Sequence, residues 1–150
     1  MTRRSPLVIA LIAVSLLLVL LATGVWRQYT MTSAARSVTL RVVEDTLSTS
    51  SARSLIANAH PDLTASIPAE ALDSYIAGLP RILGDLQALT TLSGGADVAL
   101  LPFGSRASSA QFTVGLEFAR GVAEVQIELL ESDGQWRITS YNVFSPLLSN

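Results

Sequence analysis

Apolar and polar residues follow three successive patterns along this 150-residue chain. An uncharged, strongly apolar run lies between Ser5 and Trp26, which is about the 20 residues that a helix needs to cross a bilayer. Beyond it, apolar residues recur at spacings of three and four, a pattern typical of helices packed along one side. From Gln111 onward they alternate with polar residues, which predicts strands. Together the patterns predict an α+β protein, with an N-terminal transmembrane helix followed by helices packed on a curled antiparallel sheet.

The apolar run at 6–26 is predicted to be a signal anchor that stays in the membrane. Arg3 and Arg4 precede it, which favours a cytoplasmic location for residues 1–5 under the positive-inside tendency. The alternative is a signal peptide cleaved near Gly24, where small residues offer a cleavage site. We favour the anchor because the apolar run is longer than the about 7 to 15 residues of a usual signal core.

The rest of the chain is long enough for one domain with its own core. We expect a juxtamembrane linker at 27–31, an extracytoplasmic domain at 32–146 and a short tail at 147–150. The chain has no cysteine, so this domain must be stabilised by packing without disulfides. These features favour a single-pass protein of the bacterial inner (cytoplasmic) membrane, with its C-terminal domain outside the cytoplasm.

Helices are expected in the first half of the external domain. One is expected over about 31–47, and after a serine-rich break a short helix runs to about Ala59. His60 precedes a proline, which disfavours helical geometry and ends that helix. A further stretch at 68–93 contains Pro80, so we expect two helices there with a kink or break between them.

Three alternating strands are expected in the second half, preceded by a short strand at about 97–101. With Arg120-Gly121 as the first turn, every apolar residue of one strand meets an apolar residue of the next. In that register Glu117 lies directly opposite Glu124.

Asp133-Gly134 is a strong signal for the second hairpin turn. As a two-residue turn it places Leu129 opposite Ile138 and continues one apolar face across the third strand. Regular alternation then puts Ser140 and Asn142 on this apolar face as its only polar groups.

The order of these elements resembles that of the nuclear transport factor 2-like superfamily, over roughly Thr32 to Pro146. The resemblance rests on a long helix, a short helix ending in "AHPDL", further helices and a meander closing with "DGQWRITSYNVFSP". It implies a cone-shaped, cystatin-like α+β fold, and its members include isomerases, dehydratases, binding modules and scaffolds. With its anchor, the chain also resembles assembly-factor subunits of type IV secretion systems and actinobacterial accessory proteins of lipid-import complexes.

Composition excludes several kinds of chemistry. Without cysteine or lysine the chain has no thiol nucleophile, Schiff base or thiolate metal site, and one histidine cannot build a multi-histidine zinc site. No metal or other cofactor is expected. Residues 28–150 carry seven arginines against twelve acidic residues, a formal charge of −5. Such a domain lacks the basic excess of a nucleic-acid binder.

His60 and Asp62 are the weak catalytic candidates, as a general base and the carboxylate that orients it. A histidine at a helix C-terminus, favoured there by the helix dipole, is the more ordinary interpretation.

Asn142 and Tyr141 are the candidate ligand-binding residues. A polar group such as Asn142 on an apolar face needs a hydrogen-bond partner, from a ligand or from the backbone. Trp136 and Phe144 are interpreted as core residues.

Glu117, Glu124, Glu128 and Arg137 are expected on the opposite, polar sheet face. Like charges across neighbouring strands destabilise a sheet unless something compensates them, and Arg120 and Arg137 are the nearby cations. A solvated face is favoured over a metal site, and a partner-binding or homodimer surface is the intermediate possibility.

Two functions therefore follow. The preferred one is an accessory or scaffold module that binds a protein partner, or a second copy, through the sheet face. The alternative is a module that binds a small apolar ligand in the cone, or an enzyme using His60 and Asp62, secreted if the signal is cleaved near Gly24.

Overall fold

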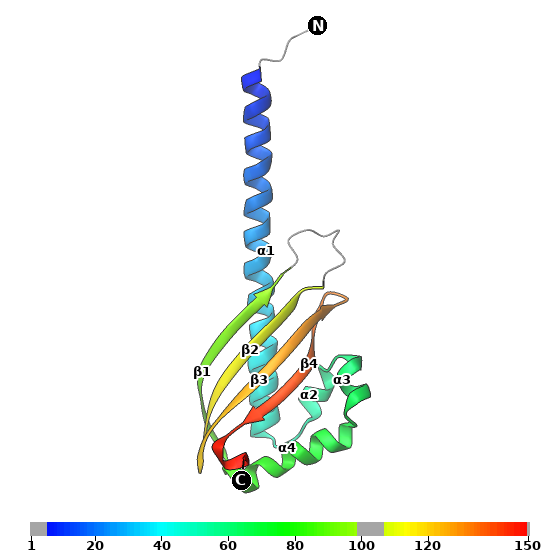
Figure 1. Cartoon of the computed structure of the whole chain (residues 1–150), viewed down its shortest axis with the longest axis vertical. Coiled ribbons are helices and arrows are strands. Elements are labelled where there is room, and N and C mark those ends of the chain that lie inside the picture. Colours follow the sequence, from blue (N-terminus) through cyan, green and yellow to red (C-terminus); the bar gives the residue numbers. More distant parts are fainter. Residues whose placement is uncertain (1–5, 99–106, 150) are drawn as a thin grey trace.

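Helices occupy the first half of the chain and strands the second, which confirms the α+β class (Figure 1). The computed structural model describes residues 6–98 and 107–149, with side chains from Val8 onward. The expected cytoplasmic segment at 1–5 and most of the strand expected at 97–101 lie outside the described residues. The elements are α1 (Pro6–Ser48), α2 (Arg53–Ala57), α3 (Pro61–Ser66), α4 (Ala69–Leu83), β1 (Leu86–Asp97), β2 (Ser109–Phe118), β3 (Gly121–Ser132), β4 (Gln135–Phe144) and the 3₁₀ helix η1 (Pro146–Leu148).

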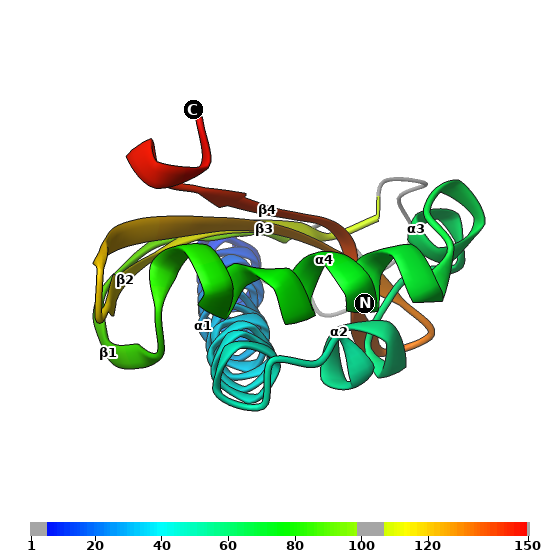
Figure 2. The same ribbon diagram turned by 90° about the horizontal axis from the view of Figure 1, so that it is seen from below.

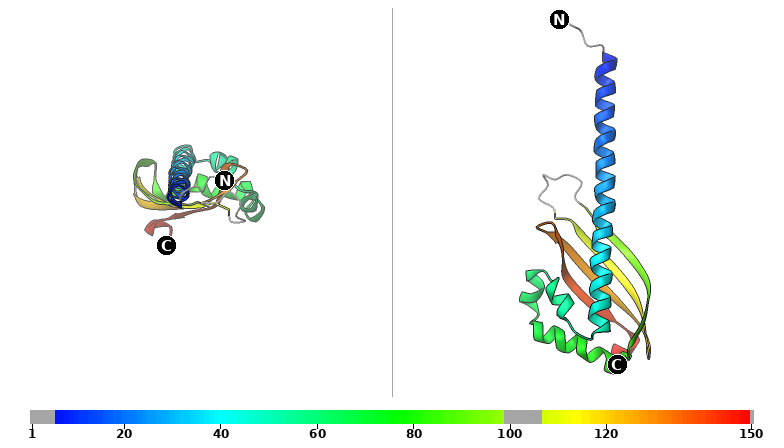
Figure 3. Two further views of the ribbon diagram at one scale, coloured as in Figure 1. Left: turned by 90° about the horizontal axis from the view of Figure 1, so that it is seen from above. Right: turned by 180° about the vertical axis from the view of Figure 1, so that it is seen from behind.

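Helix α1 is one continuous rod of 43 residues, about 65 Å long (Figure 3). Its N-terminal part is exposed and is long and apolar enough to cross a membrane. Residues 27–31, which we expect to be a juxtamembrane linker, are a helical part of α1. The Gln28 side chain donates a hydrogen bond to Ala96 O at the end of β1, at 2.7 Å. The apolar segment and the domain are therefore joined without a flexible break.

The domain core lies between the helices and one face of the sheet, which we call the inner face. The strands form an antiparallel meander in the order β1-β2-β3-β4, and Figure 2 shows α1 to α4 on a single side of it. The C-terminal part of α1 buries Val42 and Val43 against this side. The buried inner-face residues are Phe112, Val114, Leu116, Phe118, Ala123, Val125, Ile127, Leu129, Trp136, Ile138, Tyr141 and Val143.

The short helices differ from the expectation in two places. Helix α2 ends at Ala57, two residues before the expected end, and α3 was not expected. Helix α4 runs through Pro80 to Leu83 because Pro80 lies near its end, where one missing N–H costs little of the hydrogen-bond ladder. Gly84, with φ of +81°, then stops the helix in a conformation that favours glycine.

Strand β1 replaces the second helix expected within 68–93. Its leucines at 86, 89 and 92 are spaced by three, which suggested a helix. Two register irregularities, between Leu86 and Ala88 and between Leu89 and Thr91, instead turn all three leucines to the inner face. Bulges therefore produced a helix-like spacing in a strand.

The first hairpin turn lies at Ala119-Arg120, one residue before the expected position. The turn backbone is held by hydrogen bonds from Ala119 N to Asp85 O and from Arg120 N to Leu83 O, at 3.0 and 2.9 Å. The β2–β3 register is consequently shifted by two residues, which keeps the apolar face together but places Glu117 opposite Val122. The expected direct Glu117–Glu124 pair is wrong.

The second hairpin forms at Asp133-Gly134, as expected, and Leu129 pairs with Ile138. Both turn residues have positive φ, as a two-residue hairpin turn of this kind requires. A bulge then interrupts the register between Glu128 and Leu129. It rotates the rest of β4 by one position, so the placement of Ser140 and Asn142 on the inner face is wrong.

Candidate functional site

The sheet has a second face that no long helix covers. We call it the open face, and in Figure 2 only η1 and the C-terminus lie on that side. The inner and open faces alternate along each strand, so the registers define its members. They are Thr91, Ser93, Gly95, Asp97, Ser109, Gln111, Thr113, Gly115, Glu117, Val122, Glu124, Gln126, Glu128, Leu130, Arg137, Ser140, Asn142 and Phe144.

Three glutamates give the open face a negative charge. Glu124 lies between Gly115 on β2 and Phe144 on β4, while Glu128 lies opposite Gln111. The observed register makes Glu117 and Glu124 diagonal neighbours and no longer direct partners, which reduces the repulsion that we expected between them. Among the described residues, no ion pair or hydrogen bond reaches any of these three carboxylates.

The two arginines that we expected to compensate this charge are engaged elsewhere. Arg137 donates to Ala57 O at 3.3 Å and to Gln135 Oε1 at 2.6 Å, while Arg120 donates to Arg81 O at 2.7 Å. These contacts direct both guanidinium groups toward the helices or the strand edge. The acidic charge of the open face is therefore not neutralised by them.

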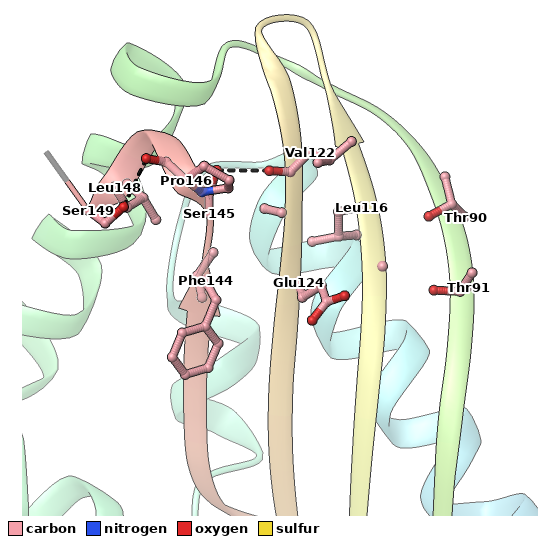
Figure 4. Close-up of a pocket in the computed structure, with 13 residues that line it drawn as sticks. Thr90, Thr91, Leu116, Val122, Glu124, Phe144, Ser145, Pro146, Leu148 and Ser149 are labelled. Atoms are coloured by element: carbon pink, nitrogen blue, oxygen red, sulfur yellow. Dashed lines mark hydrogen bonds between the residues drawn. The ribbon is translucent and has the colours of Figure 1, made fainter.

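A groove of about 640 Å³ crosses the open face near Glu124 (Figure 4). Thr90 and Thr91 of β1 line one side and Phe144 of β4 the other. Val122 and Phe144 are 62% and 51% exposed, so the groove has apolar surface next to a carboxylate. The interpretation of Phe144 as a core residue is wrong.

Gly115 forms the floor of the groove. A Cβ placed there would collide with Thr91 Oγ1 and would lie 2.9 Å from Thr90 Oγ1. Both hydroxyl groups therefore occupy the space above the glycine. A glycine within a strand marks a close approach of other atoms, and this was the one sequence signal for the groove.

The end of the groove is closed by η1, which overlaps the expected tail at 147–150. Ser145 Oγ donates to Val122 O at 2.8 Å and accepts from Leu147 N at 3.3 Å. Leu148 packs against the core. These contacts hold η1 on the sheet, and the sequence analysis did not identify them.

The two ligand-binding candidates lie on opposite faces. Asn142 is exposed on the open face, where its Nδ2 donates to Ser140 Oγ at 2.9 Å. Tyr141 is buried on the inner face, and its hydroxyl has no hydrogen-bond partner within the described part of the chain. Burial, and then the neighbouring Tyr75, raise the pKa of Tyr141 far above its ordinary value. Trp136 is buried in the core.

His60 and Asp62 are close together but form a helix cap. Asp62 N donates to His60 Nδ1 at 3.3 Å, which caps the N-terminus of α3, and the same nitrogen lies 3.3 Å from Asp62 Oδ2. His60 N also donates to Ile138 O on the edge of β4, at 2.7 Å. The Asp62 side chain is 87% exposed. These contacts give His60 a structural role, because it joins the N-terminus of α3 to strand β4.

The described residues contain no cluster of side chains suited to hold a metal ion. No group of three or more histidine, aspartate or glutamate side chains is arranged there to hold an ion.

Comparison with known proteins adds no relative, since no protein-family model, curated protein or solved structure matches this chain. The nuclear transport factor 2-like resemblance and its cone shape stay predictions. Function has to be argued from the open face and its groove.

Proposed function

We propose that this chain is a single-pass membrane protein, placed in the bacterial inner membrane, whose external domain binds another protein as an accessory or scaffold module. The observation that carries the proposal is the open face itself. It combines exposed apolar residues, Val122 and Phe144, with polar groups and carboxylates that have no partner in the described part of the chain. Exposed apolar surface surrounded by polar residues is typical of protein interaction sites.

The filled interior behind the inner face favours a protein partner over a small apolar ligand. The space inside the curved sheet is filled by α1, α4 and fully buried residues such as Phe112, Ile127 and Ile138. Asn142, around which a ligand cavity was expected, points away from this interior. The groove on the open face is shallow and solvent-exposed, which suits side chains of a protein surface.

The continuous α1 helix constrains the direction of approach. The strands run obliquely beside the α1 axis, so the open face stands along that axis (Figure 3). If residues 6–26 span the membrane, the open face looks sideways, parallel to the membrane plane. A partner then approaches from the side, as another membrane-anchored protein would.

Site-specific photo-cross-linking in the native membrane tests this proposal. A photoreactive residue replaces Thr113 at the centre of the open face, and the control replaces the exposed Ala77 on α4. We expect one adduct with a defined protein from position 113 and none from position 77. Equal capture from both positions, or no adduct from position 113, contradicts the proposal. An adduct with twice the mass of this chain would mean that the bound protein is a second copy and not a different protein.

A further inference from the structure

The groove at Glu124 has the chemistry of a site for one specific side chain. We propose that it receives an arginine of the partner protein. This inference rests on the proposed function and adds the chemical identity of the group that is bound.

Four residues on four neighbouring strands form a row across the open face. Thr91 pairs with Gly115, Gly115 with Glu124, and Glu124 with Phe144. Neighbouring strands are about 4.8 Å apart, so the row is roughly 14 Å wide. It presents the threonine hydroxyls, which lie over Gly115, then a carboxylate and an aromatic ring in that order (Figure 4).

Each member of the row matches a part of a guanidinium group. The Glu124 carboxylate accepts two parallel N–H bonds from the planar fork, and the exposed Phe144 ring offers a face for stacking. A cation over an aromatic face is also attracted by the ring quadrupole. The Thr90 and Thr91 hydroxyls, which have no hydrogen-bond partner in the described part of the chain, accept the remaining N–H groups. A compact ammonium group cannot use carboxylate, ring and hydroxyls at once.

Gly115 brings the threonine hydroxyls toward Glu124. Because residue 115 has no side chain, the Thr90 and Thr91 hydroxyls lie over it, between the Thr91 and Glu124 positions of the row. The end of the groove is held in place by the Ser145 hydrogen bonds to β3 and η1. Little ordering is therefore required when the arginine binds, which favours affinity.

Charge selects a basic partner over a second copy. Among the described residues Glu117, Glu124 and Glu128 form no ion pair, and the hydrogen bonds of Arg120 and Arg137 go to neutral acceptors instead. Two copies packed through this face would bring six carboxylates together, and opposed like charges destabilise an interface. A partner that inserts arginine removes this repulsion.

The test uses the full-length protein in detergent micelles and N-acetyl-arginine amide as the probe, followed by amide NMR shifts. The matched probe is N-acetyl-citrulline amide, which has the same shape without the charge. We expect saturable shifts at Gly115, Glu124 and Phe144 with the arginine probe. The citrulline probe and the Glu124→Gln variant should each weaken binding at least about tenfold, because a charge-assisted hydrogen bond is lost.

Two further variants define the specificity. Glu44→Gln removes an exposed carboxylate from α1 on the helix side and should change affinity less than twofold. Glu128→Gln removes the same charge from the same strand, about 13 Å from Glu124, and should weaken binding less than threefold. Equal binding of both probes, an unchanged affinity in Glu124→Gln, or an equal loss in Glu128→Gln overturns the proposed site.

The two proposals can fail separately. If position 113 captures a partner but the arginine probe does not bind, the proposed function stands and the arginine site fails. If the arginine probe binds but no adduct forms from position 113, the proposed function fails and the partner part of this inference fails with it.

Discussion

The two faces of the sheet are built from the same four strands but serve opposite purposes. On the inner face nearly every residue is apolar, buried and paired with another apolar residue across the strands. On the open face, carboxylates, hydroxyls, a glycine and an exposed phenylalanine lie side by side. The buried apolar contacts that stabilise the domain are therefore concentrated on the inner face.

The largest expected difference in stability between the two faces comes from two phenylalanines, Phe112 on the inner face and Phe144 on the open face. Phe112 is only 2% exposed, so Phe112→Ala removes a fully buried ring and should lower the free energy of unfolding by about 3–5 kcal/mol. Phe144→Ala removes a half-exposed ring and should cost less than about 1 kcal/mol. Urea unfolding of the full-length protein in detergent, followed by the fluorescence of buried Trp136, measures both values.

A loss in Phe144→Ala as large as that in Phe112→Ala would contradict the division of the faces. It would mean that the open face also supports the core. Fluorescence spectra of the two folded variants serve as the control, because they must match that of the wild type before unfolding free energies are compared.

A second test compares two strand glycines, of which Gly115 is closely surrounded and Gly95 is not. Gly115→Ala forces the Thr90 and Thr91 hydroxyls to move and should lower the free energy of unfolding by about 1–2 kcal/mol. Gly95→Ala adds a methyl group in open space and should change it by less than about 0.5 kcal/mol. The same urea titration applies. Equal values for the two variants would show that the threonine hydroxyls do not occupy the space above Gly115.

The sequence was informative wherever the pattern depended on local chemistry. The uncharged run at 6–26 identified the long apolar helix, and Asp133-Gly134 identified a turn whose two residues both need positive φ. The sequence pattern was misleading wherever contacts between distant parts of the chain set the position of a turn or the register of a strand. The turn at Ala119-Arg120 is fixed by backbone bonds to Leu83 and Asp85, and no local signal distinguishes it from the adjacent pair.

Bulges account for the other errors, including those at the candidate site. In β1 they gave the leucines a helix-like spacing, and in β4 one bulge exchanged the faces of Tyr141 and Asn142. A one-residue change in register moves every following side chain to the opposite face, so a single bulge is enough. The groove depends on pairing across all four strands, which is why the sequence analysis did not predict it.

The smallest expected effect concerns Tyr141, the residue that the bulge turns toward the inner face. Its hydroxyl is buried without a hydrogen-bond partner among the described residues, so the apolar face contains one polar atom at a cost. Tyr141→Phe removes that atom and keeps the ring, and it should raise the free energy of unfolding by about 1 kcal/mol at pH 7. A decrease would indicate that the hydroxyl does have a partner.

The pH dependence of stability provides an independent check on Tyr141. Burial, and secondarily Tyr75, raise the pKa of Tyr141 in the folded state, whereas in the unfolded chain it ionises near its ordinary pKa of about 10. Above that pH the unfolded state binds fewer protons than the folded state, so stability is complete below about pH 10 and falls as the pH rises further. Tyr141→Phe should make this alkaline fall shallower without abolishing it, because burial also raises the pKa of Tyr75. Urea titrations of both proteins between pH 8 and about 11 measure the slopes, and equal slopes would place the Tyr141 hydroxyl in contact with solvent.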